Sequence, residues 1–191
     1  MERLLKRIRS RKNNLFENGG ARLDTLIVCF SLSGKTYTIC QNLARFTPAS
    51  LSRIRTIKNF SKLRAFTSGL GHARRRKQFP LLPLEDDISS YRRIVLACPV
   101  WGGMPCPMIY GVLHQYDLEG KEVHCLLTYE KDAGKAPDIL KEEVARTGAR
   151  IASLVTVKAG GKALKKFEEK SLELYIDDEE GICIRKAAKP T

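Results

Sequence analysis

Residues 25–36 of this 191-residue chain read TLIVCFSLSGKT. The run from Thr25 to Phe30 is almost wholly apolar and rich in β-branched residues, which is typical of a strand buried on both faces of a parallel sheet. Small hydroxyl residues and Gly34 follow it, and a helical pattern begins near Tyr37. Because open parallel sheets bind ligands beyond the carboxyl ends of their strands, this order of strand, loop and helix predicts a ligand site at the loop.

Four further segments are predicted to be strands of the same sheet. Leu51–Ile57 is the weakest, because Ile54 lies between two arginines, and it is expected at an edge. The other three have nearly continuous apolar runs, as strands covered on both faces do. They are Ile94–Val100, Val123–Tyr129 and Ile151–Val157.

Helical patterns separate the predicted strands. Their apolar residues recur at three- and four-residue spacing, and Gly148 provides a stop after the third pattern. The patterns rest on Ile39, Leu43 and Phe46, on residues 108–116, on Leu140 and Val144, and on residues 164–176, with a further helix expected near residues 60–70. Alternating strands and helices predict an α/β fold, with a parallel sheet covered by helices on both faces.

The charge of the chain is unevenly distributed. The net charge is +13, and Met1 to Arg93 contain 20 Lys and Arg against 6 Asp and Glu, whereas Ile94 to Thr191 contain 14 against 15. Part of the excess is a basic amphipathic extension at residues 1–23, and part is the run Arg74–Lys77 in an irregular connector. Such a basic half binds nucleic acid, an anionic membrane or an acidic partner, or it forms a solvated face, and the sequence leaves these open.

Composition predicts one cytoplasmic domain. The apolar runs are far shorter than the ~20 residues that cross a bilayer, and no apolar segment of a secretion signal follows the basic N-terminus. The six cysteines show no C-x-x-C spacing, so we expect buried thiols in a reducing compartment and no metal site.

The loop after the first strand has the composition of a phosphate cradle. Ser31 and Ser33 offer short hydroxyl donors, Gly34 lets backbone N–H groups approach an anion, and the helix start adds a partial positive charge. Two other interpretations stay open. Gly34-Lys35-Thr36 also ends a Walker A loop, although Cys29 stands where its first glycine is required, and the loop also fits a plain helix cap.

Three motifs together resemble the flavodoxin family. Residues 31–36 are similar to its [TS]-x-[TS]-G-N-T loop, with Lys35 in place of Asn. Residues 91–105 are similar to its third strand, which runs into Pro-Val-Trp, small residues and a proline-opened helix, and residues 118–123 are similar to its Leu-x-Gly-Lys-x-Val segment. The resemblance covers residues 24–158. It implies a three-layer α/β/α flavodoxin-like fold with a five-stranded parallel sheet of order 2-1-3-4-5.

The resemblance also implies flavin mononucleotide (FMN) as the cofactor. The loop at residues 31–36 would hold the phosphate. Trp101 with its neighbouring glycines would give the flavin ring a flat wall and backbone donors, and the loop at residues 128–134 would lie along the pyrimidine side of the ring. The residues assigned to FMN are Ser31, Ser33, Gly34, Lys35, Thr36, Pro99, Val100, Trp101, Gly102, Gly103, Thr128, Tyr129 and Gly134. No catalytic residue is assigned, because the flavin carries the redox chemistry.

We therefore expect a flavodoxin-like domain at residues 24–176, followed by a tail at 177–191. The expected function is electron transfer to a redox partner protein, or reduction of a small acceptor by an NAD(P)H-dependent quinone or flavin reductase. The alternative is a binding module with a vestigial flavin site, whose basic half grips nucleic acid or an anionic partner. The sequence does not decide whether the protein forms a dimer. We expect His72, His114 and His124 to have structural roles. A redox-sensing role is a further hypothesis for Cys106, which lies on the loop beside the expected flavin.

Overall fold

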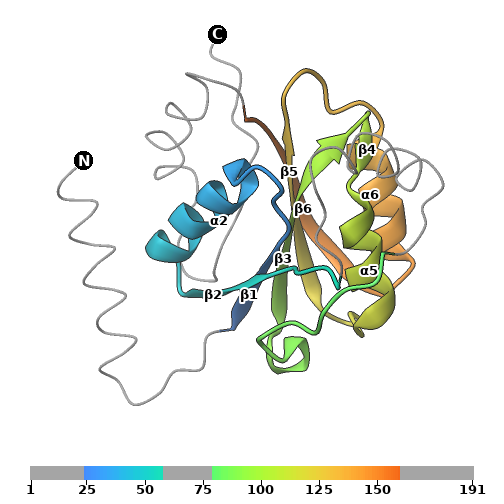
Figure 1. The fold of residues 1–191 in the computed structure, drawn as a ribbon. Helices are drawn as coiled ribbons and strands as arrows, with labels where there is room; N and C mark the ends of the chain where they lie inside the picture. Colours follow the sequence, from blue (N-terminus) through green and yellow to red (C-terminus); the bar gives the residue numbers. More distant parts are fainter. Residues whose placement is uncertain (1–23, 58–78, 160–191) are drawn as a thin grey trace, which may run out of the picture.

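The computed structural model describes residues 24–57 and 79–159. A central sheet separates α2 on one side from α5 and α6 on the other (Figure 1). Several expected segments lie outside the described residues: the extension at 1–23, the helices at 60–70 and 164–176, the run Arg74–Lys77 and the tail at 177–191.

Five parallel strands form the sheet in the order β2-β1-β3-β5-β6. Numbered along the chain without the two-residue β4, this is the expected order 2-1-3-4-5, which is confirmed. The strands are β1 (Thr25–Cys29), β2 (Ala49–Arg53), β3 (Arg93–Trp101), β5 (Glu122–Tyr129) and β6 (Arg150–Lys158), and β4 (Met104–Pro105) pairs antiparallel with β3.

The edge strand begins two residues earlier than the sequence predicts, at Ala49, and ends four residues earlier, at Arg53 instead of Ile57. The Ile54 N–H still donates to the Cys29 carbonyl at 2.8 Å, but the chain then leaves the sheet. Thr56 forms an antiparallel bridge with Leu81, and the Leu82 N–H donates to the Arg55 carbonyl at 2.9 Å. Residues 81 and 82, which are distant in the sequence, therefore pair with the backbone of Arg55 and Thr56 after the end of β2.

Within residues 24–57 and 79–159, three α-helices cover the sheet: α2 (Lys35–Phe46), α5 (Pro107–Gln115) and α6 (Ala136–Ala145), with a 3₁₀ turn η2 (Ile88–Ser90) before β3. α2 begins two residues before the expected Tyr37, because Gly34 takes φ +89° and turns the chain directly into the helix. Gly148, at φ +75°, follows the end of α6 as the sequence predicts. In the part of the chain that the structure describes, no helix is long and apolar enough to cross a membrane.

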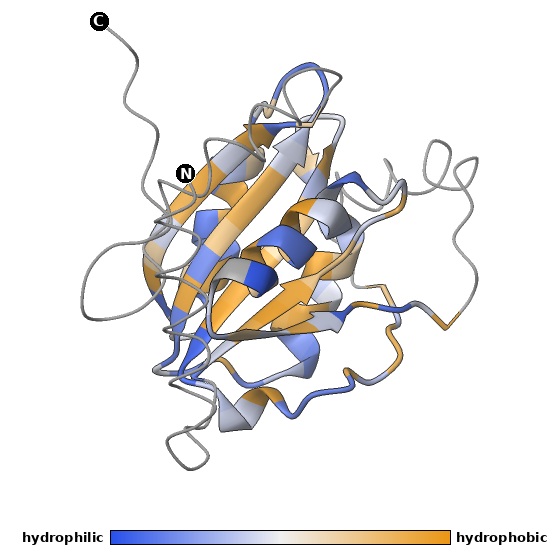
Figure 2. Cartoon of the chain, turned by 90° about the vertical axis from the view of Figure 1, so that its left-hand side faces the viewer, coloured by the Kyte–Doolittle hydropathy of each residue, from blue (hydrophilic) through white to orange (hydrophobic). Residues whose placement is uncertain are grey.

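Successive strand residues point into two separate cores. In β1, Leu26 and Val28 pack on the side of α5 and α6, whereas Ile27 and Cys29 pack on the side of α2. The strands are accordingly apolar along most of their length, and α2 is polar on its outer surface (Figure 2). The continuous apolar runs of the sequence reflect this burial on both faces.

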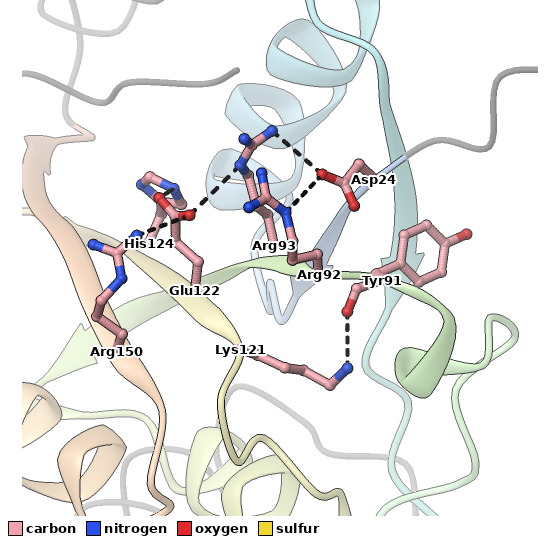
Figure 3. A network of polar contacts seen from close by, with 8 residues as sticks. All are labelled: Asp24, Tyr91, Arg92, Arg93, Lys121, Glu122, His124 and Arg150. Carbon is pink, nitrogen blue, oxygen red and sulfur yellow. Dashed lines mark hydrogen bonds and ion pairs between the residues drawn. The ribbon is translucent and has the colours of Figure 1, made fainter. Parts of the chain in front are cut away.

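An ion-pair ladder closes the amino edge of the sheet (Figure 3). Arg93, Glu122 and Arg150 are neighbours in the strand register, so their charges alternate across β3, β5 and β6. Glu122 lies 3.6 Å from Arg93 Nε and 3.0 Å from Arg150 Nη2. Asp24 extends the ladder, 3.1 Å from Arg92 Nε and 3.5 Å from Arg93 Nη1. The arginines of this edge therefore have a structural role, because they link neighbouring strands through ion pairs.

His124 lies buried behind this ladder, with only 3% of its surface exposed. Its Nδ1 is 2.9 Å from Ser153 Oγ, while Nε2 has no hydrogen bond and sits 3.5 Å from Glu122 Oε1. Burial lowers the pKa of His124, and Arg93 and Arg150 lower it further, against the opposing attraction of Glu122. These contacts support the structural role expected for this histidine.

A neutral, buried His124 makes stability depend on pH. Its folded pKa lies below the unfolded value of about 6.5, so the unfolded chain binds more protons as pH falls below that value. The free energy of unfolding should then decline with falling pH, with a slope of at most about 1.4 kcal/mol per pH unit from this group.

His124→Gln should flatten that slope, because glutamine keeps a partner for Ser153 and cannot take up the proton. Urea unfolding between pH 7.5 and 5.5 measures it. The matched control is His114→Gln, which removes an exposed histidine and should retain the wild-type slope. An unchanged slope in His124→Gln would assign the pH dependence to another group.

Candidate functional site

Three loops meet at the carboxyl edge of the sheet, at the top of Figure 1. The first joins β1 to α2, the second runs from β3 through β4 to α5, and the third joins β5 to α6. β1 pairs with β2 on one side and β3 on the other, so the order of strands reverses between the first two loops. This reversal is the usual position of a ligand site in an open parallel sheet.

The first loop places a buried hydroxyl beside the open start of α2. Ser31 is 5% exposed, and its buried Oγ has no hydrogen-bond partner among the described residues. No side chain caps α2, and its first turn carries no acidic residue. A side-chain carbon added at Gly34 would meet nothing within 4 Å, so the space beside the helix start is open. A phosphate oxygen there would accept from Ser31 and from the free N–H groups of the helix.

The same geometry removes the two competing interpretations of the loop. Cys29 is the last residue of β1 and fully buried, so it is not part of a loop of Walker A length. A plain helix cap needs a side-chain oxygen on a backbone N–H, but the residue before α2 is Gly34, and the buried Thr36 Oγ1 bonds to another hydroxyl. The start of α2 is therefore uncapped by any side chain of the described residues.

The second loop is a tight hairpin that fixes Trp101. Trp101 pairs with Met104 across a turn at Gly102 and Gly103, whose φ angles are +57° and +77°. The half-buried indole ring meets the Phe30 ring edge to face, with 6.0 Å between centroids. Sequence patterns did not predict this hairpin, because only the turn geometry brings the two residues of β4 back onto β3.

The third loop is joined to both of the others. Thr128 Oγ1 is 2.8 Å from Thr36 Oγ1, a buried contact between β5 and the first turn of α2. Gly134 lies against the second loop: a side-chain carbon added there would come within 2.6 Å of Gly103 Cα. The three predicted segments therefore form one connected wall around the helix start.

The predicted residues divide by what they contact. Ser31, Ser33 and Gly34 line the open cradle, with Ser33 exposed, and Trp101 stands half-buried on the second loop. The hydroxyls of Thr36 and Thr128 bond to each other, and Lys35 is held by Glu130. Pro99, Val100 and Tyr129 are half-buried at strand ends, Gly102 is exposed in the turn, and Gly103 and Gly134 join the second and third loops.

Sequence reasoning missed two charged contacts at this edge. Glu130 was not assigned to the site from the sequence, yet its carboxylate Oε1 lies 2.5 Å from Lys35 Nζ. Arg53, at the carboxyl end of β2, has its guanidinium 5.0 Å from the centroid of the Tyr37 ring in the first turn of α2. The charge alternation of residues 130–132 was the available signal for Glu130, but its partner is 95 residues away.

Cys106 is fully buried just before α5. Desolvation and a hydrogen bond with Cys98 raise the pKa of its thiol well above the usual value. The reactive thiolate is therefore scarce at neutral pH, and the redox-sensing hypothesis for this residue is not supported.

The described part of the basic half is largely neutralised. Of its six basic residues, Lys35, Arg55, Arg92 and Arg93 form ion pairs with carboxylates, and Arg53 stacks on Tyr37. The other 14 basic residues of the first 93 lie outside the described ranges. Within the described residues, these contacts give no specific support to nucleic-acid binding.

Comparison with known proteins places this fold. No family model and no curated sequence matches the chain. A flavoprotein from Lactobacillus acidophilus NCFM, solved in complex with FMN, shares 22% identity over 71% of this chain and 93% of its own, with a TM-score of 0.60. A protein of Bacteroides eggerthii DSM 20697 described as a flavoprotein shares 15% identity over 76% of this chain and 96% of its own, with a TM-score of 0.63. The Trp repressor binding protein of Bacillus subtilis shares 10% identity over 78% of this chain and 95% of its own, with a TM-score of 0.51. With the strand order, these likenesses identify the chain as a protein of the flavodoxin-like fold.

Proposed function

We propose that this protein binds FMN at the carboxyl edge of its sheet and acts as a flavodoxin-like redox protein. One observation carries the proposal: in the described part of the chain, the Ser31 hydroxyl is buried without a partner beside the uncapped start of α2. Leaving a buried polar group unbonded costs about 1–3 kcal/mol, which a bound phosphate would recover. The Lactobacillus acidophilus structure with FMN supports the same cofactor.

Each loop has a distinct task in this proposal. Ser31, Ser33, Gly34, Lys35 and Thr36 would bind the phosphate, which carries a charge of about −1.5 to −2 at neutral pH when its second pKa is about 6. Val100, Trp101, Gly102 and Gly103 would form one wall of the ring site, with Pro99 at its base, and Thr128, Tyr129 and Gly134 would form the other.

Bound FMN supplies transfer of one or two electrons, and the chain binds and orients it and limits its contact with water. A general acid or base is not required. Two uses of the flavin belong to the proposal: an electron carrier for a partner protein, and an NAD(P)H-dependent quinone or flavin reductase. Flavin-dependent oxidation of NADPH by a quinone would identify the reductase, and its absence alongside reduction by a partner protein would identify the carrier.

The direct test is the flavin itself. Purified protein should show the visible absorption of bound FMN, or should quench the fluorescence of added FMN with saturable stoichiometry. Trp101 is the single tryptophan of the chain, so its emission should also fall as FMN binds nearby. Colourless protein that quenches no FMN would defeat the proposal.

Ser31→Ala should separate binding from stability. The substitution removes an unpaired buried hydroxyl, so unfolding of the flavin-free protein should cost the same free energy or slightly more than in wild type. FMN affinity should fall about tenfold or more, since a hydrogen bond to a charged group is worth about 1.5–3 kcal/mol. Ser52→Ala is the matched control, because Ser52 Oγ is also buried and unpaired but lies inside β2. Equal losses of affinity in the two variants would contradict the assignment of Ser31.

Trp101→Ala should weaken FMN and riboflavin alike, by about tenfold, because an aromatic contact of roughly 0.5–1.5 kcal/mol and its buried area are lost from the ring site. Trp101→Phe should recover most of the affinity. Titrations with the two flavins measure both effects. A loss confined to FMN would place Trp101 near the phosphate instead of the ring.

A further inference from the structure

The ion pair between Lys35 and Glu130 crosses the proposed phosphate site. Lys35 is the first residue of α2 and follows Gly34 of the cradle, while Glu130 is the first residue after β5. Their charged atoms are 2.5 Å apart, and the side chains are 39% and 70% exposed. Beside this pair, the buried hydroxyls of Thr36 and Thr128 join the same two segments.

The Lys35 ammonium group can therefore pair with either of two anions, the Glu130 carboxylate or the phosphate of the proposed cofactor. Lys35 opens α2, and the first turn of this helix has no acidic residue, so the Lys35 ammonium and the helix N–H groups are positive features directly next to Gly34. The guanidinium of Arg53 at the same edge is stacked on the Tyr37 ring. Glu130 already occupies Lys35. Its carboxyl has its pKa lowered by the hydrogen bond from Lys35 and by the charge of that residue, so it stays ionised throughout the neutral range.

We infer that Glu130 is a built-in competitor of the cofactor phosphate for Lys35, and that it sets how strongly the protein prefers phosphorylated over unphosphorylated flavin. The inference rests on the proposed function. When FMN binds, the Lys35 ammonium turns from the carboxylate to the phosphate. When FMN leaves, Glu130 takes the ammonium back.

The contacts allow this exchange. An exposed ion pair contributes only about 0–1 kcal/mol, so losing it costs little. The phosphate offers more charge than one carboxylate and also meets the start of α2. The Thr36–Thr128 contact is buried and does not involve Lys35, so it holds the two loops together while the lysine changes partner.

The test is a double-mutant cycle with two ligands. Affinities of FMN and riboflavin are measured by fluorescence quenching at low ionic strength for wild type, Glu130→Gln, Lys35→Gln and the double variant. Glu130→Gln should tighten FMN about two- to fivefold, the range of an exposed ion pair, and leave riboflavin unchanged. Lys35→Gln should weaken FMN by about tenfold or more, and in that background Glu130→Gln should bring no gain, because there is no ammonium left to release.

Glu85→Gln is the matched control. Glu85 is also an exposed carboxylate, 62% accessible, and its partner Arg55 lies beyond β2, so removing its charge should change FMN affinity little. If wild type binds FMN but Glu130→Gln binds it equally or more weakly, the pair is a structural brace and the inference is wrong. A gain that persists in the Lys35→Gln background also overturns it, because repulsion through space would then be the cause. Wild type that binds neither flavin would overturn the proposed function itself.

Discussion

β1 is hydrogen-bonded along both edges and buried on both faces, and the remaining elements are arranged around it. The chain must leave it over the carboxyl edge, pass through α2 to β2 on one side, and later reach β3 on the other. The Phe30 N–H extends the pairing by donating to the Ala97 carbonyl at 2.9 Å. Ser31 follows directly, so the rigid strand holds its hydroxyl in a place where the described chain offers no partner.

Sequence reasoning recovered what depends on local pattern. Strands β1, β3 and β5 were found because burial on both faces leaves an uninterrupted apolar run. The edge strand β6 is mostly half-buried, and it was found because its apolar run is nearly continuous all the same. The end of β2 and the hairpin of β4 were missed. The end of β2 depends on the pairing of the following residues with Leu81 and Leu82. The hairpin of β4 depends on the glycine turn that brings it back onto β3. The periodicity of the sequence encodes neither of these pairings.

The candidate site shows the same division. Residues whose chemistry is visible locally, such as Ser31, Gly34 and Trp101, were named from the sequence, and the structure places them at one edge of the sheet. The contacts between the first and third loops were not predictable, because they join residues more than 90 positions apart: Thr36 with Thr128, and Lys35 with Glu130. The ladder at the amino edge has a similar origin, since only the strand register aligns its charges.

The contact between Gly103 and Gly134 gives the second and third loops a fixed spacing. Where side chains separate two loops, a change of rotamer or a substitution widens or narrows the gap. Here backbone meets backbone, so the separation is the thickness of the polypeptide itself and no rotamer can adjust it. A side chain at position 134 would push the two loops apart, because its first carbon would come within 2.6 Å of Gly103 Cα.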